Sequence, residues 1–178
     1  MLANSVTLFR VVLTFSVIAV FGAHPTLDLA VIPMIALIIV LDAVDGSIAR
    51  KRNEVSPLGE MLDTLADRLI ENTFFLYFTV QGLIPIWMPI AVMARGFLSD
   101  ALQRRHGYPT QGWRHALTRS RLSRAVSGIT KLLAFTSLAG AEVFTDTGYE
   151  SVSLLLSILA VGVCLLRGVP FFFPEKSP

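Results

Sequence analysis

Six long apolar stretches joined by short polar connectors constrain the fold of this chain more than any other feature. They occupy residues 5–22, 28–50, 59–80, 85–104, 121–144 and 150–172. About 20 apolar residues in a helix cross the hydrocarbon core of a bilayer, so each stretch is long enough to span it. The sequence therefore predicts an all-α integral membrane protein with six transmembrane helices.

Composition and length agree with this prediction. Of the 178 residues, 53% are hydrophobic and 16% are charged, whereas about 25% of the residues in a soluble domain are charged. We therefore expect residues 1–178 to form one membrane domain. The region before residue 5 is nearly uncharged, which favours a first helix over a signal peptide. Cys164 is the one cysteine, which excludes a disulfide framework.

Basic residues gather on one side of the predicted membrane. The connectors 24–26, 81–83 and 142–149 contain no Lys or Arg, and all fifteen basic residues belong to the other face or to the helix halves nearest it. Because cytoplasmic loops carry an excess of Lys and Arg, we expect both termini to be cytoplasmic. This asymmetry accounts for the net charge of +2 without nucleic-acid binding.

Six arginines cluster between the fourth and fifth stretches, and two interpretations of them stay open. They can fix the topology and contact anionic headgroups, or one or two of them can bind a substrate phosphate. The six are Arg104, Arg105, Arg114, Arg119, Arg121 and Arg124.

Four aspartates lie at the predicted cytoplasmic ends of the second and third helices. Asp42 and Asp45 are three residues apart, and Asp63 and Asp67 are four apart, so each pair shares one helix face. The short connection between the helices makes them an antiparallel hairpin, which lets the two faces meet. Four carboxylates in a low-dielectric setting must take up protons or bind cations, and hard oxygen ligands suit one or two Mg²⁺ or Mn²⁺ ions.

Small residues and an arginine accompany the aspartates. Gly46, Ala49 and Gly59 lie within a turn of them and would let a ligand or a neighbouring backbone approach closely. Arg50 follows Asp42 by two turns and offers a guanidinium fork suited to a phosphate. Carboxylates, small residues and a guanidinium together are typical of a phosphate-transfer site.

The spacing of these residues resembles the signature of the CDP-alcohol phosphotransferases. The pattern Asp42-x2-Asp45-Gly46-x2-Ala49-Arg50-x8-Gly59-x3-Asp63-x3-Asp67 matches that signature at all eight fixed positions within residues 42–67. Six helices with cytoplasmic termini also resemble the family.

The resemblance implies a reaction in which an alcohol attacks the lipid-bearing phosphorus of a donor such as CDP-diacylglycerol and displaces CMP. It implies that Asp42, Asp45 and Asp63 ligate two metal ions, and that Asp67 is both a ligand and the general base. It further implies that Gly46, Ala49 and Gly59 accommodate the cytidine and that Arg50 holds the diphosphate. A homodimer in a bacterial cytoplasmic membrane, with its active site facing the cytoplasm, is expected on the same ground.

Three further features bear on the acceptor. Asn4-x2-Thr7-x2-Arg10 has a spacing similar to that at the start of the phosphatidylglycerophosphate synthases, although a helix cap with an interfacial arginine explains it equally well. Arg95 stands where those synthases have an Arg-Glu pair, but Gly96 follows it here. Lys131 is a candidate phosphate ligand or a lysine that reaches the headgroups, and Arg119, Arg121 and Arg124 are equal candidates.

We therefore predict phosphatidyl transfer to glycerol 3-phosphate, which gives phosphatidylglycerophosphate. Inositol phosphate, serine and phosphatidylglycerol stay open as acceptors. An alternative of another class is a divalent-cation or proton transporter, since carboxylates inside a membrane also mark ion pathways.

Overall fold

The computed structural model describes residues 2–51, 57–107, 112–144 and 147–173, with the side chains of 43–51, 57, 58 and a few others left undescribed. In these residues the chain consists of helices joined by short turns, with no strand. This confirms the all-α prediction. The elements are α1 (Leu2–Val20), α2 (Pro25–Lys51), α3 (Pro57–Val80), α4 (Trp87–His106), α5 (Gly112–Arg119), α6 (Arg121–Val143), α7 (Thr147–Gly168) and the 3-10 helix η1 (Val169–Phe172).

Each of the six predicted stretches corresponds to one long helix, and α5 is an addition. This short helix falls in the segment that sequence analysis treated as a basic connector. Ser120 separates α5 from α6 and is the N-cap of α6. Its Oγ accepts a hydrogen bond from the backbone N–H of Ser123 at 3.0 Å. The sixth stretch divides into α7 and η1 near Pro170, which has no N–H to continue the α-helical bonding.

Length and composition make one helical segment of the described chain apolar enough to cross a membrane, Gly148–Phe172. Ser5–Val20 is a shorter apolar helical segment. The other long helices carry charged residues within their apolar runs, such as Asp63, Asp67 and Glu71 in α3.

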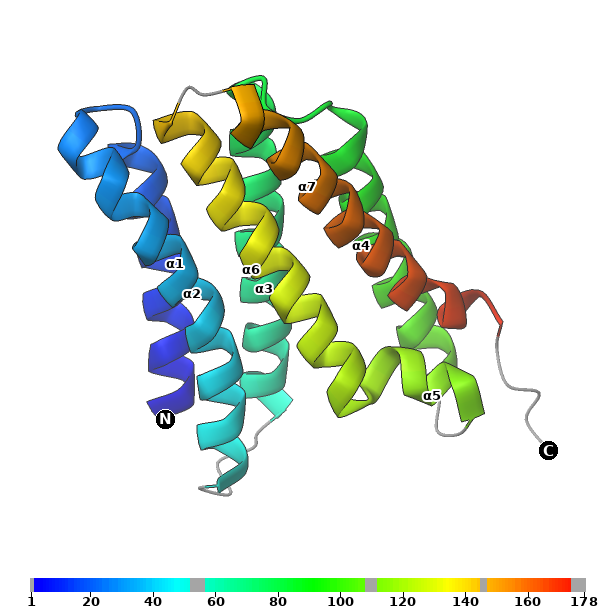
Figure 1. Ribbon diagram of the computed structural model, residues 1–178. Coiled ribbons are helices and arrows are strands. Elements are labelled where there is room, and N and C mark those ends of the chain that lie inside the picture. The colour runs from blue at the N-terminus through cyan, green and yellow to red at the C-terminus, as the bar shows by residue number, and fades with distance from the viewer. Residues whose placement is uncertain (1, 52–56, 108–111, 145–146, 174–178) are drawn as a thin grey trace.

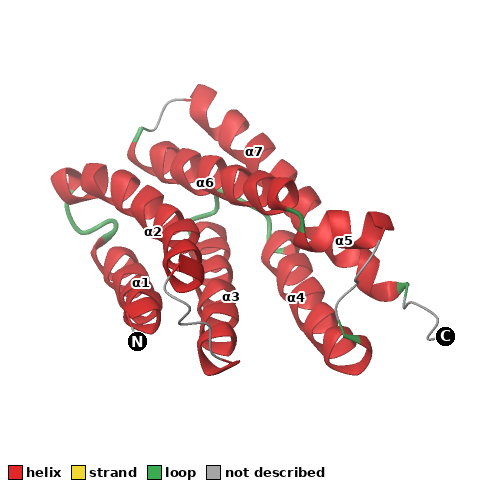
Figure 2. Ribbon diagram, turned by 90° about the horizontal axis from the view of Figure 1, so that it is seen from below, coloured by secondary structure: helices red, strands yellow, loops and turns green. Residues whose placement is uncertain are grey.

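The six long helices form a closed ring. Going round it, α1 packs on α2, α2 on α6, α6 on α7, α7 on α4, α4 on α3, and α3 again on α1. Figure 1 shows the helices running up and down, and Figure 2 shows the same ring seen from below. The short helix α5 packs on α6, α7 and η1 at the lower end in Figure 1.

Aromatic side chains fill the middle of the ring. Phe135 of α6 contacts Phe74, Phe75 and Phe78 of α3, with ring centroids 5.3, 4.9 and 6.4 Å apart, and all four side chains are buried. These contacts join α3 to α6 across the ring. Below this aromatic core, toward the lower end in Figure 1, lie the beginnings of α1, α3 and α6 and the ends of α2, α4 and α7. That end carries the candidate site.

Candidate functional site

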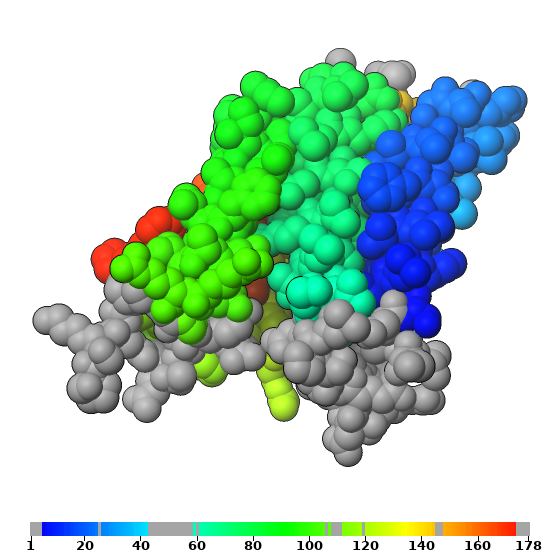
Figure 3. Space-filling view, turned by 180° about the vertical axis from the view of Figure 1, so that it is seen from behind, coloured from blue at the N-terminus to red at the C-terminus, as the bar shows by residue number. Residues whose placement is uncertain are grey.

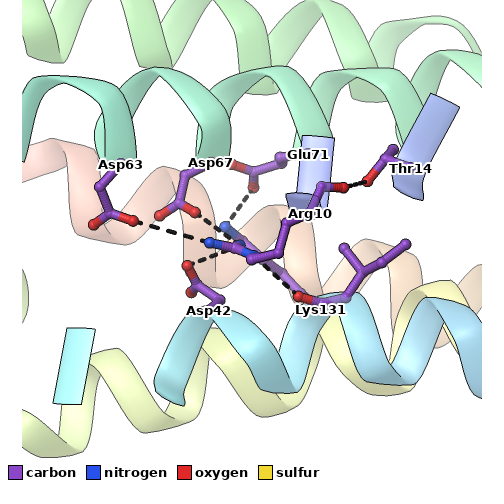
Figure 4. A network of polar contacts seen from close by, with 8 residues as sticks. Arg10, Thr14, Asp42, Asp63, Asp67, Glu71 and Lys131 are labelled. Atoms are coloured by element: carbon purple, nitrogen blue, oxygen red, sulfur yellow. Dashed lines mark hydrogen bonds and ion pairs between the residues drawn. The ribbon is translucent and has the colours of Figure 1, made fainter. Parts of the chain in front are cut away.

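Three of the predicted aspartates meet at the lower end of the ring. Asp42 comes from α2, and Asp63 and Asp67 come from one face of α3, where the four-residue spacing stacks them. One carboxylate oxygen of each lies within 4.8 Å of the others, and each side chain is about two-fifths exposed. Figure 4 shows the three carboxylates converging. Asp45 lies in α2, but its side chain is outside the described residues.

Arg10 of α1 occupies the centre of this carboxylate cluster. Its Nη2 lies 2.9 Å from Oδ1 of Asp42 and 3.1 Å from Oδ1 of Asp67, and its Nη1 lies 3.9 Å from Asp63 (Figure 4). Its Nε donates to the backbone carbonyl of Ile38 at 3.2 Å. Because only 3% of its side chain is exposed, the guanidinium supplies a buried positive charge that ties α1 to α2 and α3.

The donor set of the cluster fits a hard divalent cation. Carboxylate oxygens are the ligands that Mg²⁺ and Mn²⁺ take, and three of them converge here from two helices. Asp42, Asp63 and Asp67 would hold such an ion. Arg10 already contributes one positive charge to the same place, so an ion and the guanidinium would share the carboxylates.

A cavity of about 570 Å³ opens beside the cluster between α2, α3 and α6. We name it the carboxylate cavity. Asp42, Asp63 and Asp67 line one side, and Arg121, Arg124 and Gly128 of α6 are on the other. Apolar side chains such as Ile39 and Leu132 complete it. The cavity thus combines acidic, basic and apolar groups.

A second cavity of about 220 Å³ lies between α3, α4, α6 and α7. We name it the basic pocket, because four cationic side chains line it: Arg68, Arg95, Lys131 and Arg167. Asp67 lines both cavities and stands where they adjoin. On the back of the molecule, Figure 3 shows the surface hollowed between α3 and α4 toward this end.

The cations of the basic pocket differ in how they are paired. Lys131 lies 3.0 Å from Glu71, Arg68 donates from Nη2 to Asp100 at 3.1 Å, and Arg167 donates to the backbone carbonyl of Thr118 at 3.2 Å. The Nε atoms of Arg95 and Arg167 are both buried without a hydrogen-bond partner among the described residues, but Arg167 is held through its Nη2 atom. Arg95 is therefore the cation of the pocket most available to an incoming anion.

Comparison with known proteins agrees with this arrangement. The family model described as CDP-alcohol phosphatidyltransferase matches residues 1–166. The chain belongs to the CDP-alcohol phosphatidyltransferase family. It is a family of membrane-bound enzymes of phospholipid synthesis.

Three curated relatives represent different members of the CDP-alcohol phosphatidyltransferases. CDP-diacylglycerol–glycerol-3-phosphate 3-phosphatidyltransferase of Bacillus subtilis is 29% identical over 73% of this chain and 51% of its own length. Cardiolipin synthase (CMP-forming) of Streptomyces coelicolor is 37% identical over 43% of this chain and 37% of its own. Archaetidylinositol phosphate synthase of Aeropyrum pernix is 37% identical over 39% and 36%. The chain thus spans about half of these relatives or less.

The residues that the sequence suggested for acceptor binding lie in different parts of the structure. Arg95 and Lys131 line the basic pocket, whereas Arg121 and Arg124 line the carboxylate cavity. Arg10 lies among the carboxylates and lines neither cavity, and Thr7 is buried close by in α1. Gly59 is half-buried at the start of α3. The side chains of Asn4, Gly46, Ala49, Arg50 and Arg119 lie outside the described residues.

Sequence reasoning missed Arg68 and Arg167. Glu71 and Lys131 form their pair one turn beyond Asp67, which makes Glu71 a wall of the basic pocket (Figure 4). Arg167 lies in the last turn of α7, within the segment that is long and apolar enough to cross a membrane, and a charge there is a signal that could have identified it.

Proposed function

We propose that this chain transfers a phosphatidyl group from CDP-diacylglycerol to glycerol 3-phosphate, with release of CMP. The observation that carries the proposal is the position of Asp67 between two cavities of different character. One cavity has the acidic and apolar lining that suits metal ions, a diphosphate and acyl chains. The other has the small basic lining that suits a phosphate-bearing alcohol.

Asp67 would act as the general base. The acceptor hydroxyl forms a bond to the phosphorus that carries diacylglycerol, the bond from that phosphorus to the oxygen of CMP breaks, and the hydroxyl proton passes to the carboxylate of Asp67. Bound Mg²⁺ or Mn²⁺, two ions by analogy with the family, would neutralise charge on the diphosphate and on the leaving CMP. The four aspartates, Asp42, Asp45, Asp63 and Asp67, would hold the ions. Arg10 would orient Asp42 and Asp67 through its two close contacts.

The donor would occupy the carboxylate cavity. We propose that Gly46, Ala49 and Gly59 leave room for the cytidine and that Arg50 holds the diphosphate. Arg121 and Arg124 face the aspartates across the cavity and would contact the same phosphates.

The acceptor phosphate would lie in the basic pocket against Arg95, Lys131 and Arg167. A pocket of about 220 Å³ walled by charged side chains suits a small phosphorylated alcohol. Serine lacks a phosphate to meet these cations, and the two acyl chains of phosphatidylglycerol would meet a polar wall. Inositol phosphate shares the phosphate, and the experiment below separates it from glycerol 3-phosphate.

The outer surface supports a position within a membrane. Large apolar side chains are more than half exposed on the outward faces of several helices: Leu8, Phe9, Ile90, Phe97, Leu122, Ile129, Leu155 and Leu166. A soluble monomer rarely exposes so extensive an apolar surface. We propose six spans with both termini and the site at the cytoplasmic face of a bacterial inner membrane, and a homodimer in which each protomer has its own site.

The experiment that tests the function is CMP release by the detergent-purified chain with CDP-diacylglycerol and Mg²⁺ or Mn²⁺. Glycerol 3-phosphate, inositol phosphate, serine and phosphatidylglycerol are offered separately. We expect CMP and a phosphorylated lipid product with glycerol 3-phosphate. Turnover with another of the four would overturn the acceptor assignment. Cation uptake into sealed vesicles without any lipid product would favour the transporter.

A further inference from the structure

Two glycines lie where arginines of the basic pocket cross neighbouring helices. A Cβ atom built on Gly168 of α7 would lie 2.8 Å from Cγ of Arg95 and 3.0 Å from its Nε. A Cβ atom on Gly96 of α4 would lie 3.1 Å from Nη1 of Arg68. Carbon atoms that are not bonded do not approach within 3 Å, so even a methyl group at residue 168 would displace the side chain of Arg95.

The backbone does not explain glycine at residue 168. Its φ of −81° and ψ of −28° are helical angles that every L-amino acid adopts. The described glycines that do need a positive φ are Gly22, Gly82, Gly107 and Gly112, all in turns or at helix ends. The missing side chain of Gly168 therefore serves the close approach of Arg95.

Arg95 depends on this space more than the other cations do. Glu71, Asp100 and the carbonyl of Thr118 fix Lys131, Arg68 and Arg167 by ion pairs or hydrogen bonds. The buried Nε of Arg95 has no such partner among the described residues, and the stem of its side chain passes against the backbone of Gly168. Packing against α7, rather than hydrogen bonding, holds this guanidinium at the pocket.

Gly96 makes room for Arg68 in a similar way. Arg68 reaches past Gly96 to pair with Asp100 one turn further along α4. A glutamate at residue 96, as in the Arg-Glu pair of the similar synthases, would compete with Asp100 for this guanidinium and crowd it. Glycine instead of glutamate at residue 96 is therefore compatible with the Arg68–Asp100 pair.

We propose that Gly168 is a positioning residue that seats Arg95 for the phosphate group of the acceptor. The inference rests on the proposed function, in which the basic pocket receives that phosphate. It assigns to the end of α7 a role in acceptor affinity, although glycine itself touches no substrate.

The first test compares Gly168→Ala with Gly162→Ala. Both glycines belong to α7, but a Cβ atom on Gly162 meets nothing within 4 Å. We expect Gly168→Ala to raise the KM for glycerol 3-phosphate about tenfold, with kcat and the KM for CDP-diacylglycerol within about twofold of the original chain. Gly162→Ala should change none of the three. Equal effects of both substitutions, or a change in the donor KM alone, would overturn the proposal.

The second test is a double-mutant cycle with Arg95→Ala, which removes the atoms that the new methyl group would meet. Gly168→Ala should add little to the acceptor KM of Arg95→Ala, because the two substitutions act through one guanidinium. Additive effects would overturn the proposal. If Gly168→Ala alone does not fold, the double variant should fold, since the collision is gone; failure of both would show that the glycine serves the backbone instead.

The same cycle separates this inference from the function on which it rests. An unchanged acceptor KM in Arg95→Ala would refute the placement of the phosphate in the basic pocket, and the positioning role with it. A raised KM in Arg95→Ala beside an unchanged KM in Gly168→Ala would refute the positioning role alone.

Discussion

Arg10 donates a hydrogen bond from Nη2 to the carboxylate of Asp67 at 3.1 Å, although 57 residues separate them in the chain. The same Nη2 atom lies 2.9 Å from Asp42. One buried cation thus balances carboxylates of two other helices at the point where the two cavities adjoin. The positive charge of Arg10 reduces the repulsion among the carboxylates when no metal ion is bound. It also reduces the negative charge that is left to attract metal ions.

Replacing Arg10 by Met should destabilise the metal-free chain by about 2 kcal/mol, because three carboxylates would lose their shared counter-charge. This loss of stability is smaller than for a fully buried ion pair, because the carboxylates are partly exposed to solvent. Thermal unfolding with and without Mn²⁺ measures the effect. We expect Mn²⁺ to raise the melting temperature of the variant more than that of the original chain, since the ion replaces the missing charge.

Arg104→Met is the control for this experiment, because Arg104 is exposed on α4. It should leave the melting temperature and the response to Mn²⁺ unchanged. An equal response to Mn²⁺ in Arg10→Met and the original chain would show that Arg10 and the ion do not share the carboxylates.

Replacing Asp67 by Asn should lower the rate of CMP release by at least about a hundredfold, because the amide cannot accept the hydroxyl proton. The fold should remain, since asparagine keeps the size of the side chain. Glu150→Gln is the matched control: Glu150 is exposed in the first turn of α7, at the opposite end of the ring. Single-turnover assays with saturating donor measure the chemical step. Turnover retained in Asp67→Asn would assign the base to another group.

The meeting of Asp42, Asp63 and Asp67 could be predicted because it depends on local rules. The spacing along α3 and the short connection to α2 place these carboxylates together almost regardless of the other helices. The approach of Arg10 could not be predicted, because it depends on how α1 packs against α3. From the sequence, its spacing with Asn4 and Thr7 fitted an acceptor contact and a helix cap with an interfacial arginine equally well.

The basic pocket lay beyond sequence reasoning for a similar reason. Arg95 and Lys131 were candidates, but no spacing relates α4 to α6, and the part of Arg167 depends on the return of α7 beside α4. The role proposed for Gly168 could not be predicted from the sequence, since glycine is common near helix ends. The helix α5 was missed because eight residues with four polar or basic side chains among them resemble a connector.

The proposed topology predicts opposite labelling of two engineered cysteines. Cys164 is buried and is the one cysteine of the chain, so a Cys164→Ser background carries no other thiol. Ala23→Cys and Arg105→Cys are both at exposed positions and are separated by α2, α3 and α4. In right-side-out vesicles, a membrane-impermeant maleimide should label residue 23 and should reach residue 105 only after permeabilisation. The reverse pattern would invert the orientation, and labelling of both would refute three crossings between them.

Phe135→Ala should lower the free energy of unfolding by about 3–5 kcal/mol, because it leaves a cavity among Phe74, Phe75 and Phe78 where α3 meets α6. Phe97→Ala is the control, since that ring is 66% exposed on α4. Unfolding of both variants in mixed micelles measures the difference. A cost as small as that of Phe97→Ala would mean that the aromatic core does not hold the ring together.

Lys131 and Glu71 should contribute jointly to the free energy of unfolding, whereas Lys131 alone should contribute to acceptor binding. Glu71→Gln leaves a largely buried ammonium group without its counter-charge, and Lys131→Met leaves a buried carboxylate, so each single substitution should destabilise the chain by about 2–4 kcal/mol. The double variant should lose less than the two losses together, because it leaves neither charge unpaired. The KM for glycerol 3-phosphate should nevertheless rise in both variants that lack Lys131. Restoration of the acceptor KM in the double variant would show that Lys131 is a structural partner of Glu71 and makes no contact with the phosphate.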